Sequence, residues 1–247
     1  MEENYFSRQG KNYLKRRPDY PAHLFQYLAS LCVYHELAWD CATGNGQAAI
    51  KLADFFNQVI ATDINQHQIE NAIVKKNVIY RVATAGQSQL AANSVDLITA
   101  AQAAQWIPLQ EFYSEVNRVA KTNGVIALFG FREIRINKSL DDFLYYYLQD
   151  LLKPYWRNGK KLYDDKYQSL DFPYELIAAP SFFIENNWLP SDVLNLIDSY
   201  SAAQEYLDHH GYYPSHTVKN QFLSLWGDPT AKRLVSIPIY MKVGRIK

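Results

Sequence analysis

The chain has 247 residues, of which 48% are hydrophobic and 20% charged, a composition typical of a folded protein with a substantial core. Its 25 Lys and Arg residues balance its 25 Asp and Glu residues, so no overall positive field favours a nucleic-acid partner, and we expect none. The sequence has no apolar run of about 20 residues that could span a bilayer and no apolar segment next to Met1. Together with only two cysteines, these features favour a cytoplasmic protein without membrane contact.

Segments with strand and helix patterns alternate over the first half of the chain. A helix is expected after Pro21, because apolar residues there recur at three- and four-residue intervals. Strands are expected at residues 37–41, 59–63, 78–82, 95–99 and 125–129. Helices are expected between strands, at residues 47–55, about 66–75 and 109–119. Because parallel strands need such crossovers, the pattern predicts an α/β, Rossmann-like, doubly wound and mostly parallel sheet with helices on both faces.

The pattern changes after Phe131. Apolar residues at helical spacing up to Leu152, followed by an aromatic and charged stretch, predict a helical cap. Two more strands, at residues 182–184 and 235–241, bring the expected sheet to seven, and Pro238 predicts a partly edge-like pairing for the last one. We therefore expect four parts: an N-terminal helical segment over the binding site (1–34), a Rossmann-like core (35–131), a helical cap or substrate region (132–174) and C-terminal strands and helices completing the sheet (175–247).

A glycine turn follows the first expected strand, in the segment Asp40-Cys41-Ala42-Thr43-Gly44-Asn45-Gly46. Open parallel sheets hold nucleotide ligands at this place, and glycines let the backbone approach the ligand closely. About twenty residues later, Asp63 ends the second strand, where it can accept hydrogen bonds from ribose hydroxyls. The two features together predict a nucleoside site.

Charge distinguishes two candidate ligands of this site. Gly44, Gly46 and Ala49 fit a dinucleotide fingerprint, so an NAD-dependent oxidoreductase is one alternative. Asp40, however, would repel a pyrophosphate and attract an ammonium group. S-adenosylmethionine carries an ammonium and a sulfonium group and no phosphate, so Asp40 and Asp63 together favour S-adenosylmethionine as the cofactor.

The same segments resemble the class I S-adenosylmethionine-dependent methyltransferases, and within them the type 11, trans-aconitate methyltransferase-like small-molecule branch. The likeness is most specific over residues 39–63. It extends to residues 17–21, 94–97, 101–103 with Trp106, and 226–229. The resemblance implies a methyltransferase that transfers the methyl group of S-adenosylmethionine to a small molecule by in-line displacement.

The resemblance also implies which residues hold the cofactor. The glycine turn would pass beneath the methionine and ribose parts, the residues after the second and third strands would bind ribose and border adenine, and those after the fourth strand would face the transferred methyl group. The expected cofactor-binding residues are Asp40, Ala42, Gly44, Gly46, Asp63, Ile64, Ala85, Gly86, Ala101 and Gln102.

Three positions depart from the usual residues of the family. Ala42 stands where glycine is usual, Gly86 where glutamate is common, and Gln105, before Trp106, where histidine is frequent. A histidine general base is therefore missing, which favours a carboxylate acceptor, since a carboxylate needs no deprotonation at neutral pH. The same departures leave open a non-catalytic S-adenosylmethionine-binding protein.

The expected partner is a small-molecule methyl acceptor. The residues expected near it are Tyr13, Arg17, Tyr20 and Trp106. Arg16, Arg132 and Arg157 are further candidates to hold an anionic acceptor, because a guanidinium matches a carboxylate with two hydrogen bonds. The six histidines share no metal-binding spacing, so no metal site is expected. No residue is assigned a catalytic role, since transfer from a sulfonium chiefly requires alignment and exclusion of water.

Overall fold

A single mixed sheet runs through the protein, with strand order β3-β2-β1-β4-β5-β8-β6 and with β7 also paired to β8. The computed structural model describes residues 18–156 and 160–247. Its strands are β1 (Leu37–Cys41), β2 (Gln58–Asp63), β3 (Val78–Val82), β4 (Val95–Ala101), β5 (Ala120–Phe131), β6 (Glu175–Leu176), β7 (Phe182–Trp188) and β8 (Arg233–Arg245).

Strands β1 to β5 are parallel to one another, and β8 is antiparallel to β5, β6 and β7. All seven predicted strands are present, and the two-residue β6 is an additional one. The predicted mostly parallel α/β fold is therefore confirmed. The buried parallel strands are nearly continuous apolar runs, because both faces of the sheet are covered.

Helices cover both faces of the parallel part of the sheet. The helices in this part are α3 (Ala22–Ser30), α4 (Gln47–Leu52), α5 (Gln66–Glu70) and α6 (Leu109–Val119). Successive residues of β1 point to opposite faces: Ala38 belongs to the apolar core that includes α3 and α4, whereas Trp39 packs against Phe112 of α6, with ring centroids 5.7 Å apart. These two layers hold the carboxyl ends of the strands in a fixed order.

The predicted helix at about residues 66–75 is too long. Helix α5 ends at Glu70 and contributes no buried residue to the core. Beyond it, the backbone N–H of Ile73 donates to the carbonyl of Asn45, and the hydroxyl of Tyr80 donates to the carbonyl of Ile73. These contacts draw residues after α5 toward the turn that follows β1, so the helix cannot continue.

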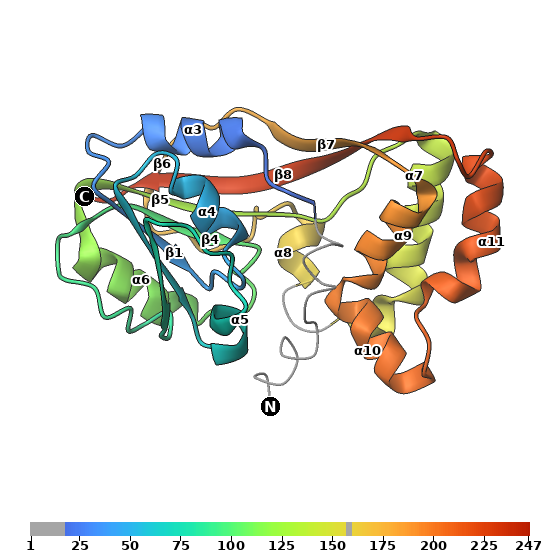
Figure 1. Ribbon diagram of the computed structural model, residues 1–247, viewed down its shortest axis with the longest axis horizontal. Coiled ribbons are helices and arrows are strands. Elements are labelled where there is room, and N and C mark those ends of the chain that lie inside the picture. The colour runs from blue at the N-terminus through green and yellow to red at the C-terminus, as the bar shows by residue number, and fades with distance from the viewer. Residues whose placement is uncertain (1–17, 157–159) are drawn as a thin grey trace.

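The second half of the chain forms a helical lobe beside the sheet. It contains α7 (Lys138–Tyr146), a π-helical turn (Tyr147–Leu151), a 3₁₀ turn (Lys153–Tyr155), α8 (Lys160–Asp164), α9 (Pro190–Asp198), α10 (Ser201–His210) and α11 (Ser215–Trp226). In Figure 1, helices α7, α9, α10 and α11 gather in one group, and α8 lies between this group and the sheet. Phe143 of α7 packs on Phe222 of α11. Helices α9, α10 and α11, which lie beyond residue 174, thus pack in the same lobe as α7. The expected domain boundaries remain a prediction.

Strand β8 links the two lobes, as Figure 1 shows. It pairs with β5 over residues 239–245 and with β7 over residues 233–239. These two pairings overlap only at Ile239, and β6 adds a second neighbour only at residues 244–245, so β8 is paired on one side along most of its length and the predicted partly edge-like pairing is confirmed. Pro238 is tolerated because it lies in a break of the ladder on the β5 side, between the Ile239–Phe131 pair and the Ser236–Arg135 bridge. No helix among the described residues is long and apolar enough to cross a membrane.

Candidate functional site

The turn after β1 is built from residues in the left-handed conformation. The φ angles of Ala42, Gly44 and Gly46 are +52°, +57° and +89°, a region that glycine adopts without steric cost. A Cβ atom on Gly46 would lie 2.0 Å from the hydroxyl oxygen of Tyr80, so only glycine fits there. A Cβ atom on Gly44 would meet nothing within 4 Å among the described residues. Tyr80 therefore packs against the turn at Gly46, whereas no described residue covers the Cβ position of Gly44.

Asp63 connects this turn to the end of β2. Its Oδ2 atom accepts a hydrogen bond of 2.8 Å from the N–H of Gly44, and its Oδ1 atom accepts one of 2.8 Å from the N–H of Asn65. Partial burial raises the pKa of Asp63, and these backbone donors oppose that effect. Each carboxylate oxygen has a second lone pair, so Asp63 can still accept hydrogen bonds from the hydroxyls of a ligand.

Asp40 lies beneath the turn and has no exposed surface. Its Oδ2 atom accepts a hydrogen bond of 2.5 Å from the Thr43 hydroxyl, and its Oδ1 atom accepts one of 2.7 Å from the Thr99 hydroxyl. Burial raises the pKa of Asp40 to about 6, although both hydroxyl bonds lower it. The sequence indicated the acid alone; the two threonines that support it were missed, because Thr99 is 59 residues away and belongs to β4.

The residues expected at the adenine ring differ in exposure. Ile64, directly after β2, exposes 58% of its surface, which is unusual for a large apolar side chain, whereas Ala85, after β3, is buried. A Cβ atom on Gly86 would lie 3.0 Å from Cβ of Glu111. A side chain at position 86 would therefore begin in close contact with the side chain of Glu111 of α6, which would have to shift slightly to make room for it.

A buried carboxylate anchors the loop that contains Ala85 and Gly86. Glu115 accepts hydrogen bonds at Oε1 from the N–H of Ser88 and from its hydroxyl, at 2.8 and 2.5 Å. Arg118 donates to both carboxylate oxygens of Glu115 and also to the carbonyl of Leu90. These bonds lower the pKa of Glu115 to about 2. Glu115 is a supporting residue of the site that the sequence did not reveal.

The end of β4 presents two glutamines, Gln102 directly after Ala101 and Gln105 one turn later. Gln102 has a φ of +59°; its amide donates to the carbonyl of Phe131 and accepts from the N–H of Phe131, both at 2.7 Å. The amide nitrogen of Gln105 donates to the carbonyl of Gln102 at 3.0 Å. Its amide oxygen, Oε1, is buried without a hydrogen-bond partner among the described residues, so it can accept from a donor on a ligand. Trp106 is half-buried.

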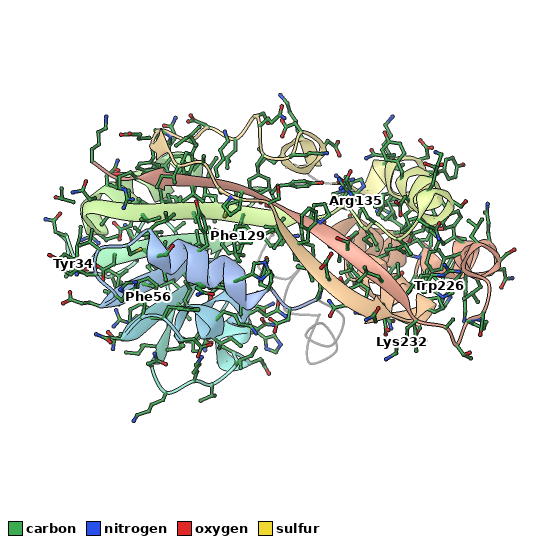
Figure 2. All side chains as sticks on the ribbon, turned by 90° about the horizontal axis from the view of Figure 1, so that it is seen from above. Tyr34, Phe56, Phe129, Arg135, Trp226 and Lys232 are labelled. Atoms are coloured by element: carbon green, nitrogen blue, oxygen red, sulfur yellow. The ribbon has the colours of Figure 1, made fainter. Side chains whose placement is uncertain are left out.

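The residues expected at the acceptor are placed in part. Tyr20 is buried and packs edge-on against Phe129 and Phe131 of β5, with ring centroids 5.3 and 5.8 Å apart; Figure 2 marks Phe129 on the sheet. Arg132 follows β5 and forms an ion pair of 2.7 Å with Asp164 of α8. The remaining candidates, Tyr13, Arg16, Arg17 and Arg157, lie outside the described residues.

Hydrogen bonds between strand ends join most of these positions into one edge. Asp40 at the end of β1 is bonded to Thr99 of β4, and Gly44 is bonded to Asp63. The N–H of Ala83, after β3, donates to the carbonyl of Asp63. The edge therefore combines an open glycine turn, an accepting carboxylate and an exposed apolar side chain at Ile64, at the position where open parallel sheets bind nucleosides.

Known proteins share this architecture over almost the whole chain. Residues 39–128 match the family model described as "Methyltransferase domain". A protein of Dictyostelium discoideum whose name assigns it as a methyltransferase is 30% identical over 243 residues, which cover 96% of this chain and 92% of that protein. This chain belongs to the methyltransferase family. A solved structure from Anaeromyxobacter dehalogenans, described as a type II methyltransferase, is 32% identical, with a TM-score of 0.87 and coverage of 93% of this chain and 98% of that one.

More distant structures share only the fold. One from Anabaena variabilis, described as a methyltransferase from an antibiotic biosynthesis pathway, is 15% identical with a TM-score of 0.52, covering 90% of this chain and 98% of that one. The relatives at 30% identity or more make this methyltransferase an enzyme of the class I, S-adenosylmethionine-dependent type. The alternative of an NAD-dependent oxidoreductase is set aside, and membership of the trans-aconitate-like branch remains a prediction.

Proposed function

We propose that the enzyme transfers a methyl group from S-adenosylmethionine to a carboxylate oxygen of a small organic acid. The observation that carries this proposal is the pair of glutamines after β4. The Gln102 amide is tied to Phe131, and the Gln105 amide is tied to Gln102. An amide cannot take up a proton at neutral pH, so an acceptor that arrives already ionised suits this surface better than an amine or a hydroxyl.

The residues of the strand edge fit the cofactor. Asp63 has lone pairs for the ribose hydroxyls, and the exposed Ile64 offers an apolar surface for adenine. No atom of the described residues lies within 4 Å of a Cβ position on Gly44, which leaves room for a ligand to approach the backbone there. When bound, S-adenosylmethionine supplies a methyl group attached to a positively charged sulfur, and the sulfur becomes a neutral thioether once the methyl group has been transferred. The proposed cofactor-binding residues are those named from the sequence.

Asp40 has an indirect role in this proposal. Because the side chain is fully buried under Thr43 and the glycine turn, its charge acts on the ligand across the turn. A negative charge in a low-dielectric environment attracts the ammonium and sulfonium groups more strongly than it would in water. Asp40 therefore favours a cationic cofactor over a pyrophosphate.

The remaining task of the protein is alignment and exclusion of water. Gln102 is fixed in position by two hydrogen bonds, and α8 lies between the strand edge and the helical lobe (Figure 1). A carboxylate held in line with the methyl group needs no base. We also retain as predictions a small-molecule partner, no nucleic-acid partner and a cytoplasmic location.

The first test is calorimetric titration of the purified protein with S-adenosylhomocysteine, with NAD in parallel. We expect micromolar binding of S-adenosylhomocysteine alone. Asp63→Ala removes the hydrogen bonds to two ribose hydroxyls and should weaken binding at least about 100-fold, or about 3 kcal/mol. The matched control is Asp54→Ala, which removes an exposed carboxylate that pairs with Lys75, and it should leave binding unchanged.

The second test measures methyl transfer from labelled S-adenosylmethionine to small acids and to their amides and alcohols. Transfer to acids with formation of a base-labile methyl ester would support the proposal. Binding of NAD in place of S-adenosylhomocysteine would contradict the cofactor assignment, and transfer to amides or alcohols only would contradict the acceptor class.

A further inference from the structure

Arg132 is a buried cation at the boundary between the sheet and the helical lobe. It directly follows Phe131, the last residue of β5, at the same edge as the glycine turn and the two glutamines. Only 9% of its side-chain surface is exposed. A guanidinium remains charged at every pH that proteins tolerate and has five N–H donors, so burying it without partners is unfavourable.

The partners of Arg132 leave one nitrogen unused. Nη1 donates to Oδ1 of Asp164 at 2.7 Å, and the guanidinium carbon lies 4.3 Å from the ring centroid of Trp156. Nη2 is buried and has no hydrogen-bond partner among the described residues. Buried unpaired donors are rare in native proteins, and a ligand is one of the explanations they call for.

The unused nitrogen is also held in a fixed position. The Trp156 ring and the Asp164 carboxylate restrict the plane of the guanidinium, and the hydroxyl of Tyr200 donates to the Arg132 carbonyl at 2.9 Å. The preceding residue, Phe131, is bound through both its N–H and its carbonyl to the Gln102 amide. Arg132 is therefore rigidly connected to the glutamine expected beside the transferred methyl group.

We propose that Nη2 of Arg132 binds the carboxylate of the methyl acceptor, which makes Arg132 a specificity-determining residue for organic acids. This inference rests on the proposed function. Asp164 exposes 36% of its side chain, so water screens its charge from the acceptor better than it screens the buried guanidinium. The cation can consequently attract a second carboxylate on its Nη2 side.

This arrangement accounts for the charges in the reaction. One carboxylate oxygen accepts a hydrogen bond from Nη2, while a lone pair on the other oxygen forms the bond to the methyl carbon. The carbon–sulfur bond breaks, and its electron pair goes to the sulfur. No proton is transferred. The carboxylate that is methylated enters with a negative charge and becomes a neutral ester group, which loses its attraction to Arg132, so the same residue that selects the acid promotes release of the product.

The test compares Arg132→Gln and Arg132→Lys with a matched control, Arg135→Gln. Arg135 lies three residues further along, beside the helical lobe in Figure 2, and its exposed side chain pairs with Glu133. S-adenosylhomocysteine binding, measured first by calorimetry, should stay within about two-fold of wild type in all variants, because none of them lies in the cofactor site. This measurement also shows that each variant is folded.

The second measurement uses succinate, phenylacetate and octanoate as acceptors, each beside its neutral amide. For the acid that wild type methylates best, Arg132→Gln should lower kcat/KM at least about 100-fold, chiefly through KM, since it removes a charge-assisted hydrogen bond. It should also abolish the preference for binding the acid over its amide, an effect that a purely structural role would not produce. Arg132→Lys keeps the charge and serves if the glutamine variant does not fold; we expect a loss of about ten-fold, because the lysine cannot bind both Asp164 and the acceptor in the same geometry.

The outcomes separate this inference from the proposed function. If wild type methylates an acid and Arg132→Gln and Arg132→Lys both retain its kcat/KM and its preference over the amide, the role of Arg132 is overturned and the proposed function stands. If wild type binds S-adenosylhomocysteine but methylates none of the acids, both are overturned.

Discussion

The hydroxyl oxygen of Tyr80 lies where the side chain of residue 46 would begin, 2.0 Å from a Cβ atom built on Gly46. Tyr80 belongs to β3, and its hydroxyl donates to the carbonyl of Ile73 at 2.7 Å. The aromatic side chain thus fills the space beneath the turn after β1. The shape of the cofactor turn depends on a residue at the edge of the sheet, two strands away from β1.

Gly46→Ala should therefore destabilise the protein and prevent cofactor binding. We expect the free energy of unfolding to fall by about 2–4 kcal/mol, from the left-handed backbone and from the clash with Tyr80. Urea denaturation measures this loss. The control is Gly211→Ala, which has a similar φ of +79° but meets nothing within 4 Å among the described residues; it should cost only about 1 kcal/mol. Equal losses in the two variants would contradict a role for Tyr80.

The affinity for a cofactor with an ammonium group should depend on pH through Asp40. Burial raises the pKa of Asp40 to about 6, so below this pH the side chain is protonated and no longer attracts a cation. S-adenosylhomocysteine should bind up to about ten-fold more weakly at pH 5 than at pH 7.5. Calorimetry at both pH values measures this change, and it should shrink in Asp40→Asn. A change of the same size in that variant would assign the pH dependence to another group.

The same group affects folding with the opposite sign. In the unfolded chain Asp40 releases its proton near pH 4, whereas in the folded protein it does so near pH 6. Its contribution to the free energy of unfolding is therefore largest below pH 4 and decreases as the pH rises to 6, by at most about 3 kcal/mol. Urea denaturation of wild type and Asp40→Asn at pH 4.5 and 6.5 should show a difference that favours wild type at the lower pH.

Ala42→Gly should stabilise the enzyme slightly. The φ of +52° at Ala42 costs about 1–2 kcal/mol for a residue with a Cβ atom, and the greater freedom of glycine in the unfolded chain offsets about 0.5–1 kcal/mol of this. The expected net gain is about 0.5 kcal/mol in thermal or urea denaturation. The control is Ala92→Gly, at an exposed alanine outside the left-handed region, which should lose stability. A loss in both variants would show that Ala42 is not strained.

Glu115→Gln should loosen the loop that borders the adenine ring. Glu115 accepts hydrogen bonds from Ser88 and Arg118 and is almost fully buried. Replacing the carboxylate by an amide leaves buried donors without an ionised partner, and we expect a loss of about 2–3 kcal/mol in the free energy of unfolding. S-adenosylhomocysteine should bind more weakly as well. In wild type, the pKa of about 2 means that this contribution is present above pH 4.5 and is lost only as the pH falls toward 2.

The sequence predicted the features of the fold that depend on local patterns. The strands were found because buried parallel strands are apolar along their whole length, and Gly44 and Asp63 were found because the turn and the acid keep a fixed spacing. The length of α5 was wrong because a contact between Ile73 and Asn45, which no helical pattern reveals, ends the helix. The packing of α7 against α11 is not visible in the sequence for a similar reason, since Phe143 and Phe222 meet only in the folded chain.

Supporting contacts of the site were the least predictable. The contacts of Asp40 with Thr99, of Gly46 with Tyr80, and of Gly86 with Glu111 each join residues that are far apart in the sequence. In the sequence, Gly86 was only a missing glutamate, and the close contact that a side chain there would make with Glu111 is visible only in the structure. Whether the named residues bind cofactor and acceptor remains a prediction that the titrations above decide.

The side-chain amide of Gln102 donates to the carbonyl of Phe131 and accepts from its N–H. It thus replaces the backbone hydrogen bonds that a longer β4 would make with the end of β5. In the proposed complex, the distance between the methyl donor beside Gln102 and the guanidinium of Arg132 would therefore be set by the register of β4 and β5. Inserting one residue into β5 before Phe131 would turn Arg132 to the opposite face of the sheet, whereas side chains of the helical lobe can vary without altering that spacing. Related enzymes with new acceptors should accordingly diversify in α9, α10 and α11 and conserve both the length of β5 and Trp156, whose ring lies against the Arg132 guanidinium.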